Sequence, residues 1–502
     1  MNTQRSTQFR RNGSVLVIVL WVTTGLVALS LYFANTMSLE LRAAENRSAA
    51  FAADQAIQAG ARYVTAVLSA FATNGVVPDP TFYQSEAVPV GDANFWLIGR
   101  AVDYPVQPDQ VFFGLVDEGA KINLNTVPLE TLQLLTNMTL QLAANIYDWR
   151  NTNGTITDGG DGPMVYAQFN PSYMCKNAPY ESIDELKYVY PLDLGLLYGE
   201  DRNLNGALDP GEADTNRNGV VDCGLLEFVT VNTREPNTAP DGSQRINVRN
   251  PANSAAALRS MLETNLTSER LNEVMQRLGI AGGTGAPAGG GGQAGGGGRP
   301  TGGGGTQQPG GGNQPPGGGG GAQAAAASVT FNSPLAFYRG SGLTEDEFAV
   351  ISDYITVTNS SFLYGRINVN TAPLPVLACL PGMSAASAQL LVSFRQQSPD
   401  RLTSIAWVSE ALAQDDTALE ALTAVDCITT RSYQFTADIA ALGPHGRGYR
   451  RVRFVYDLAE GEPRIVYRQD LSHLGWALGQ YVRRSHGPLR GLELAAGRNA
   501  VF

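Results

Sequence analysis

The chain has 502 residues, of which 35 are Lys or Arg and 46 are Asp or Glu, so its net charge is −11 near neutral pH. An acidic surface repels polyanions, which argues against a nucleic-acid-binding protein. Only three histidines occur, and none of the GxSxG, HExxH or Walker motifs is found in the sequence, so we predict no enzyme.

A short basic leader precedes an apolar segment at the N-terminus. Arg5, Arg10 and Arg11 lie before about twenty mostly apolar residues that end near Ala34, a length that spans a bilayer once. Positive charge precedes this span and is absent directly after it, so we expect residues 1–13 in the cytoplasm and the bulk of the chain outside. No convincing signal-peptidase site follows Ala34. The alternative is an uncleaved signal anchor that holds an unrelated periplasmic protein.

The apolar segment continues as an Ala-rich stretch with apolar residues at helical spacing. We predict one helix over residues 14–72, roughly 85 Å long at the rise of an α-helix. Its first half is apolar all round, and its second half is amphipathic.

Residues 73–118 hold two runs rich in aromatic and β-branched residues, FWLIGRAVDY and QVFFGLVDE, which predict two antiparallel strands. A helical module is predicted over residues 119–280. It opens with KINLNTVPL, a motif that recurs as RINVNTAPL at 366–374 and in part as RINVRNP at 245–251. In each copy the Asn/Thr pair before Pro predicts a helix start, with Thr as the N-cap and Pro in the first turn.

Residues 201–222 form two tandem acidic loops, DRNLNGALDPGE and DTNRNGVVD. In the first loop every ligand position of an EF-hand carries an oxygen donor, and Gly206 occupies the sharp turn. The ligands are Asp201, Asn203, Asn205, the carbonyl of Ala207, Asp209 and Glu212. We therefore predict a structural calcium ion as the cofactor.

The second loop repeats this spacing but lacks the closing carboxylate, because Leu225 occupies its position 12. Its ligands would be Asp214, Asn216, Asn218, the carbonyl of Val220 and Asp222. This loop is therefore the weaker site or half of a shared one. For both loops the alternative is a solvated turn without metal. No paired helices of a calcium sensor flank the loops, so we expect the ion to staple a loop.

Residues 281–327 consist of Gly, Pro, Gln and Ala with almost no charge, and we predict a disordered linker. A second helical module follows over residues 328–429, in which Thr344 and Glu347 form a capping box. Its Leu-Pro-Gly turn between two apolar runs resembles a helix-hairpin-helix. Because Gly382–Gln389 carries no basic residue, we expect the hairpin to serve packing and not DNA binding.

Residues 430–475 alternate as three strands of an antiparallel sheet, and residues 476–502 are predicted to be a loosely held tail. Two cysteines lie on each side of the glycine-rich segment. The simplest of the three possible pairings joins Cys175 with Cys223 and Cys379 with Cys427, which an oxidising compartment permits. The alternative is four buried free thiols.

The basic leader, the glycine and the two-part helix together resemble the N-terminus of type IV pilins and type II secretion pseudopilins. This resemblance implies that a prepilin peptidase cleaves after Gly13 and leaves Ser14 as the new N-terminus. Most such proteins carry Glu at mature position 5, where this chain has Ile18. Within the family the K-type minor pseudopilin usually lacks this Glu, and a subunit without it needs no predecessor in the filament, which suits a tip.

The segments ISDYITVTNSSFLYGRINVNTAPLPVLACLPGM, IYDWRNTNG and YESIDELKYVYPLDLGLLYGEDRNLNG, taken with the anchor, resemble the K-type minor pseudopilin of the type II secretion system. The resemblance implies an α+β fold, in which a long N-terminal helix packs on a small antiparallel sheet and a large, mostly helical domain is inserted. It also implies calcium in the inserted domain, and Asp148, Asp158 and Asp161 are candidates for further ligands. The glycine-rich segment and the size of the chain depart from the family.

The resemblance further implies a non-enzymatic subunit that caps the pseudopilus tip during export of folded proteins across the outer membrane. Such a subunit is anchored in the inner membrane by a single span, with its bulk in the periplasm. Its partners are other minor pseudopilins, the inner-membrane secretion platform and the prepilin peptidase. A second hypothesis is a membrane-anchored calcium-dependent adhesin or a DNA-uptake pseudopilin, which a salt-dependent affinity for duplex DNA would favour.

Overall fold

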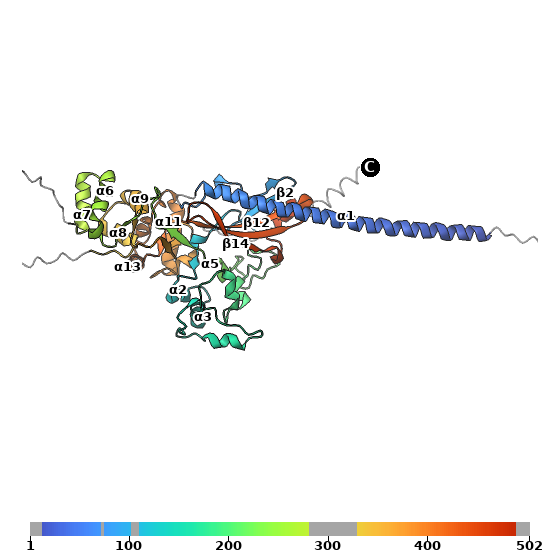
Figure 1. Ribbon diagram of the computed structural model, residues 1–502, viewed down its shortest axis with the longest axis horizontal. Helices are drawn as coiled ribbons and strands as arrows, with labels where there is room; N and C mark the ends of the chain where they lie inside the picture. The colour runs from blue at the N-terminus through green and yellow to red at the C-terminus, as the bar shows by residue number, and fades with distance from the viewer. Residues whose placement is uncertain (1–12, 72–74, 102–109, 281–328, 488–502) are drawn as a thin grey trace, which may run out of the picture. The chain divides into compact units, whose positions relative to one another are not determined.

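The computed structural model shows a long N-terminal helix, an antiparallel sheet and a region of short helices (Figure 1). It describes residues 13–71, 75–101, 110–280 and 329–487. The predicted α+β class is confirmed. The predicted leader and glycine-rich linker lie outside the described residues.

The chain divides into two compact units. Unit 1 comprises Met1–Pro236, Ser361–Leu422 and Cys427–Phe502, and unit 2 comprises Asn237–Ser360 and Thr423–Asp426. The sequence had instead predicted two helical modules separated by the glycine-rich linker. That division is corrected, because the segments on both sides of residues 281–328 belong to the same unit.

Unit 1 is built on α1, Gly13–Ser69, which runs as one helix as predicted. It is the one helix among the described residues that is long and apolar enough to cross a membrane. Its side chains from Val15 to Ser48 are exposed, apart from the half-buried Thr36, and burial begins at Ala49. The apolar half is therefore free of the fold, and the amphipathic half packs on it.

The sheet of unit 1 has the strand order β1-β2-β12-β13-β14, with β3 also paired to β12. The three predicted C-terminal strands are confirmed as β12 to β14. The two earlier runs form β2 and β3, but both pair with β12. The strands are β1 Val88–Val90, β2 Ala93–Ile98, β3 Val116–Asp117, β12 Gln434–Leu442, β13 Arg450–Asp457 and β14 Arg464–Asp470.

Every residue of β12 is buried, because the strand has a covered face on both sides. Phe435 and Ile439 belong to the core cluster that also holds Ile57 of α1. Ala440 and Leu442, on the other face by the alternation of a strand, belong to the cluster of Trp96 and Ala207. The second face thus packs against the first acidic loop, to which Ala207 belongs.

Three short parallel strand pairs organise the rest of the chain, and each begins at one copy of the repeated motif. They join β4 Ile122–Asn123 to β5 Val229–Thr230, β7 Ile246–Asn247 to β8 Ile355–Thr356, and β10 Ile367–Asn368 to β11 Ile428–Thr429. We call these modules A (121–230), B (245–356) and C (366–429). The partial third echo is therefore a third module of its own.

The helices of the modules are short, and a further strand pair, β6 Arg234–Pro236 with β9 Phe362–Tyr364, lies in unit 1. The helices are α2 Leu129–Gln133, α3 Leu140–Arg150, α4 Leu194–Tyr198, α5 Leu225–Phe228, α6 Ala255–Asn265, α7 Ser268–Arg277, α8 Pro334–Ser341, α9 Glu345–Ile351, α10 Leu374–Leu377, α11 Ala385–Gln397, α12 Trp407–Ala411 and α13 Asp416–Ala424. The hairpin of α10 and α11 turns at Gly382, where φ is +70°.

Two local predictions differ from the structure. The N-caps of α2 and α10 are Pro128 and Pro373, and not the preceding threonines, because Thr371 is engaged by Asp117. The predicted tail contains a helix, α14, Gly479–His486, which buries Val482. The capping box is confirmed: the Glu347 amide donates to Thr344 Oγ1 at 3.3 Å, and Thr344 N donates back to the Glu347 carboxylate.

Candidate functional site: two acidic loops held on the sheet

The first acidic loop is closed by its own side chains. Asp201 accepts hydrogen bonds from the Asn205 and Gly206 amides at 2.9 and 2.7 Å. Asn205 Oδ1 accepts from the Ala207 amide at 2.9 Å, and Gly206 has φ +76°. Asp, Asn and Gly thus supply the turn that the spacing predicted.

The remaining predicted ligands complete the same loop. Asn203 Nδ2 donates to Asp209 Oδ2 at 2.6 Å, and Glu212 accepts from the Asp209 amide at 3.0 Å. Asp201 is 1% exposed, and burial raises its pKa although Arg100 opposes the shift. Burial likewise raises the pKa of Glu212. The loop therefore holds two carboxylates whose charge is only partly compensated.

The second loop repeats this geometry residue by residue. Asp214 accepts from the Asn218 and Gly219 amides at 3.2 and 2.9 Å, and Asn218 Oδ1 accepts from the Val220 amide at 2.7 Å. Asn216 Nδ2 donates to Asp222 Oδ2 at 2.5 Å. The two loops also share a left-handed residue ahead of the glycine, Leu204 in the first and Arg217 in the second.

Glu200 completes the second loop, a role that the spacing did not predict. Its carboxylate accepts from the Thr215 amide at 2.5 Å and from the Asp222 amide at 3.2 Å. In the first loop Glu212 accepts from the amides of the equivalent residues, Arg202 and Asp209. Glu200 therefore makes, in the second loop, the contacts that Glu212 makes in the first, which Leu225 at position 12 cannot make. The only sequence signal was a Glu directly before the first loop.

The donor set of the loops fits calcium. Asp, Asn, Glu and backbone carbonyls supply the hard oxygen ligands that this ion takes. Asn203 Oδ1, at position 3 of the first loop, is buried and has no hydrogen-bond partner among the described residues. No three His, Cys, Asp or Glu side chains gather at a metal-holding distance in the described ranges. Four of the ten ligand side chains of the two loops, counting Glu200, are asparagines, and carboxylates such as those of Asp201 and Asp214 accept hydrogen bonds from backbone amides.

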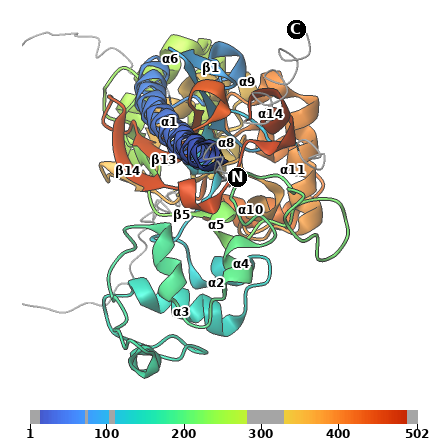
Figure 2. The ribbon, with the colours of Figure 1, turned by 90° about the vertical axis from the view of Figure 1, so that its right-hand side faces the viewer.

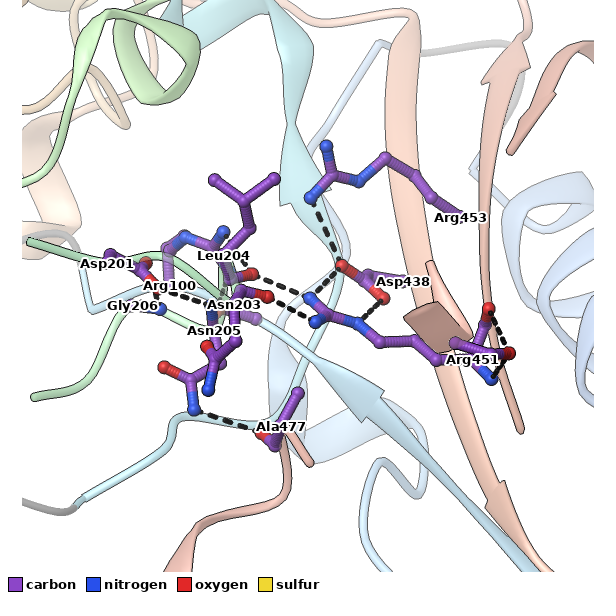
Figure 3. A network of polar contacts seen from close by, with 12 residues as sticks. Arg100, Asp201, Asn203, Leu204, Asn205, Gly206, Asp438, Arg451, Arg453 and Ala477 are labelled. Carbon is purple, nitrogen blue, oxygen red and sulfur yellow. Dashed lines mark hydrogen bonds and ion pairs between the residues drawn. The ribbon is translucent and has the colours of Figure 1, made fainter. Parts of the chain in front are cut away.

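A buried arginine network ties the first loop to the sheet (Figure 3). Arg451 of β13 is fully buried and donates to the carbonyls of Asn203 and Leu204. It also forms a bidentate pair with Asp438 of β12, at 2.8 and 2.7 Å. Arg100 donates to the Leu204 carbonyl at 3.0 Å. The loop backbone is thus clamped by two guanidinium groups.

Each carboxylate of this network is paired with arginine. Burial alone would raise the pKa of Asp438, but Arg451 and then Arg453 outweigh it and hold the pKa at about 2. Arg100 pairs with Glu227 of α5 at 2.7 Å. None of these residues was predicted to belong to the site. A lone acid in the apolar run of β12 was the only hint, since a buried carboxylate needs a buried cation.

The predicted disulfides are not formed, and all four cysteines are free thiols. Cys175 Sγ lies 3.9 Å from the Asp148 carbonyl. The backbone of Cys223 forms an isolated antiparallel β-bridge with Gly199, and Cys223 lies near Glu227. Cys379 Sγ donates to the Pro375 carbonyl at 3.1 Å, while the Cys427 carbonyl accepts from the Ile367 amide. Each predicted partner thus has other neighbours.

The further ligand candidates lie elsewhere in module A. Asp148 accepts from the Thr157 amide at 3.0 Å, and Asp161 accepts from Asn145 at 2.6 Å. These contacts hold the chain after α3. Asp158 has no contact with the acidic loops that the structure records. Gly13 and Ser14, the predicted cleavage residues, lie at the first turn of α1.

Comparisons with known proteins bear on the same chain. Residues 367–426, nearly all of module C, match the family model described as Type II secretion system (T2SS), protein K. Residues 367–426 are therefore similar to protein K of the type II secretion system. The resemblance to K-type minor pseudopilins is thereby confirmed over this segment.

Among solved structures the chain is similar to one from the GspK-GspI-GspJ complex of the enterotoxigenic Escherichia coli Type 2 Secretion System. The two are 9% identical with a TM-score of 0.39, over 83% of this chain and 96% of the other. A search of curated proteins finds none that matches. The protein K assignment therefore rests on module C.

Proposed function

We propose that this chain is a minor pseudopilin of the K type, a structural subunit of the type II secretion pseudopilus. The observation that carries the proposal is the protein K match of residues 367–426. The apolar half of α1, exposed along its whole length, supports a single-pass anchor in the inner membrane, with the head in the periplasm.

The subunit caps the tip of the pseudopilus during export of folded proteins. Two features support this position: Ile18 replaces the glutamate that pairs with a preceding subunit, and modules A to C enlarge the head beyond α1 and its sheet. Its partners are other minor pseudopilins, which contact the exposed side chains of α1, and the inner-membrane secretion platform. The role is non-enzymatic.

Calcium, in this proposal, holds the acidic loops rigid. Asp201, Asn203, Asn205, Asp209 and Glu212 would hold one ion, and Glu200 would complete the set of the second loop. The bound ion would neutralise the carboxylates that burial leaves partly compensated. The arginine network then transmits the order of the first loop to β12 and β13.

The N-terminus of the mature protein tests the proposal. Mass spectrometry of the chain from membranes of cells with the prepilin peptidase should find a start at Ser14, and cells without the peptidase should retain Met1. An intact Met1 in both strains, or a cut beyond Ala34, would contradict a pseudopilin. The DNA-uptake alternative is not favoured, since the hairpin segment 382–389 has no basic residue.

A further inference from the structure

Helix α14 carries a basic face on the side of unit 1 from which α1 projects. The helix, Gly479–His486, has the sequence GQYVRRSH with Arg483, Arg484 and His486 in its last turn and no acidic residue. Val482 is buried against the sheet, and the His486 ring lies 5.4 Å from that of Trp96. The helix is thus fixed to the fold by one side.

The loop that ends β12 joins α14 to α1. A Cβ at Gly446 would collide with the backbone oxygen of His486, and one at Gly448 would collide with the backbone of Ala49. Arg447 in the same loop pairs with Glu45 at 2.6 Å. Figure 2 views the molecule from the side on which α1 projects, and α14 is seen there beside α1. The end of α14 therefore lies at the level where α1 leaves the fold.

The exposed side chains of α14 form a cationic, aromatic surface. Tyr481 is 78% exposed. Arg483 and Arg484 are exposed, and no acidic side chain among the described residues pairs with them. Basic residues in a last turn also favour the helix dipole, which accounts for their sign. It does not account for an exposed tyrosine beside them in a chain of net charge −11.

The membrane lies close to this surface. Exposed apolar side chains of α1 continue to Leu41, so the headgroups are expected near Arg42. From Arg42 to Ala49 the helix rises only about 11 Å. This is somewhat more than one Debye length, which is about 8 Å at physiological ionic strength. Anionic headgroups are therefore within electrostatic reach of α14.

We propose that α14 and the loop 443–448 form a docking surface for the anionic phospholipids of the membrane that anchors α1. The contact holds the head down on the bilayer, with Arg483 and Arg484 on phosphate groups and Tyr481 at the interface. Leaving the membrane then requires breaking this contact. The inference rests on α1 as a membrane anchor and is independent of assembly into a pseudopilus.

Hydrogen exchange of the full chain in lipid nanodiscs tests this surface. In discs with about one third phosphatidylglycerol, amides of 443–448 and 479–487 should exchange on the order of tenfold more slowly than in pure phosphatidylcholine discs. The variant R483E/R484E should lose the difference, and R277E/R464E, which makes the same change of charge at exposed sites elsewhere, should keep it. Should the reversal unfold α14, R483Q/R484Q replaces it.

Two outcomes would overturn the proposal. One is equal exchange of these segments in both lipid compositions. The other is an equal loss of protection in R277E/R464E, which would show that overall charge, and not this face, attracts the head. Because exchange is read on the isolated chain, failure here leaves the N-terminal processing test untouched.

Discussion

Modules A and C share one frame, a parallel strand pair with two helices after its first strand, and differ in the segment between those helices and the second strand. In both, the side-chain oxygen of an Asn in the first strand accepts a hydrogen bond from the backbone amide two residues later, at 2.8 Å for Asn123 and 3.0 Å for Asn368. In both, the residue directly after the strand accepts a hydrogen bond at its carbonyl from an arginine 26 residues later: Leu124 from Arg150 and Val369 from Arg395. The repeated motif thus specifies the same strand and helix end twice.

The difference lies between the last shared helix and the closing strand. Module C fills this interval with α13, which buries Leu419 and Leu422. Module A has α4, the two acidic loops and α5 in this interval, and half of the buried side chains of the loops are polar: Asp201, Asn203 and Asn205. Apolar burial stabilises the first directly, whereas the buried carboxylate of the second needs charge compensation, from Arg100 and, in our proposal, from calcium. One frame can therefore hold either a hydrophobic insert or a polar one.

Removing the clamp on module A should have the largest effect. Arg451→Met leaves the Asp438 carboxylate buried without its bidentate partner, so we expect a loss of about 3–5 kcal/mol in the free energy of unfolding. Urea denaturation of the chain measures it. Arg464→Met, an exposed arginine of the neighbouring strand, is the matched control and should be near neutral. Equal effects of both changes would contradict the clamp.

Calcium should stabilise through module A alone. At a hundredfold excess over its dissociation constant, calcium adds about 2.7 kcal/mol to a folded protein that binds one ion. D201A/E212A should lower the melting temperature in calcium and reduce the response to chelator to what the second loop contributes. The double variant E263A/E269A, which removes two exposed acids of unit 2, should respond as the wild type does. A chelator response of wild-type size in D201A/E212A would contradict the assignment of the first loop.

The shared frame predicts matched effects at its two arginines. Arg150→Met removes a half-buried donor from backbone carbonyls and Arg395→Met removes a buried one, so each should cost about 1–3 kcal/mol in the free energy of unfolding. Denaturant melts of the two variants check this. If one variant is neutral and the other severe, the frames are not equivalent.

The smallest effect is a pH dependence at the module C strand. Asp117 accepts from Thr371 Oγ1 at 2.5 Å and from Asn368 at 3.1 Å, and burial raises its pKa to about 6. Its folded pKa lies above its unfolded one, so protonation favours the folded state. The wild type should therefore lose about 2 kcal/mol of stability relative to Asp117→Asn as pH rises from 4 to 7. A pH-independent difference would contradict this.

The sequence predicted what local spacing encodes. The length of α1, the strands β12 to β14 and the tight turn of the first loop follow from periodicity and turn chemistry. The repeated motif likewise pointed to duplicated modules, although its third copy was counted only as an echo. These features are local, so a single sequence contains them.

Long-range pairing could not be predicted in the same way. Arg451 is 247 residues from Leu204, and Thr436 is 318 residues from Glu118, and no local pattern relates them. The second strand of module B lies beyond the glycine-rich segment, which hid the pairing of β7 with β8. The predicted cysteine pairs were wrong for a related reason. The placement of two cysteines on each side of a linker does not show which cysteines are close in space.

Hydrogen exchange in calcium and in chelator compares the two inserts most directly. The account predicts that chelator speeds exchange across residues 200–223 of module A and leaves residues 403–424 of module C unchanged. The variant Glu200→Gln should show the faster exchange at 214–222 even in calcium. Exchange that is unaffected by chelator in both segments, or accelerated equally in both, would contradict a calcium-held insert on a shared frame.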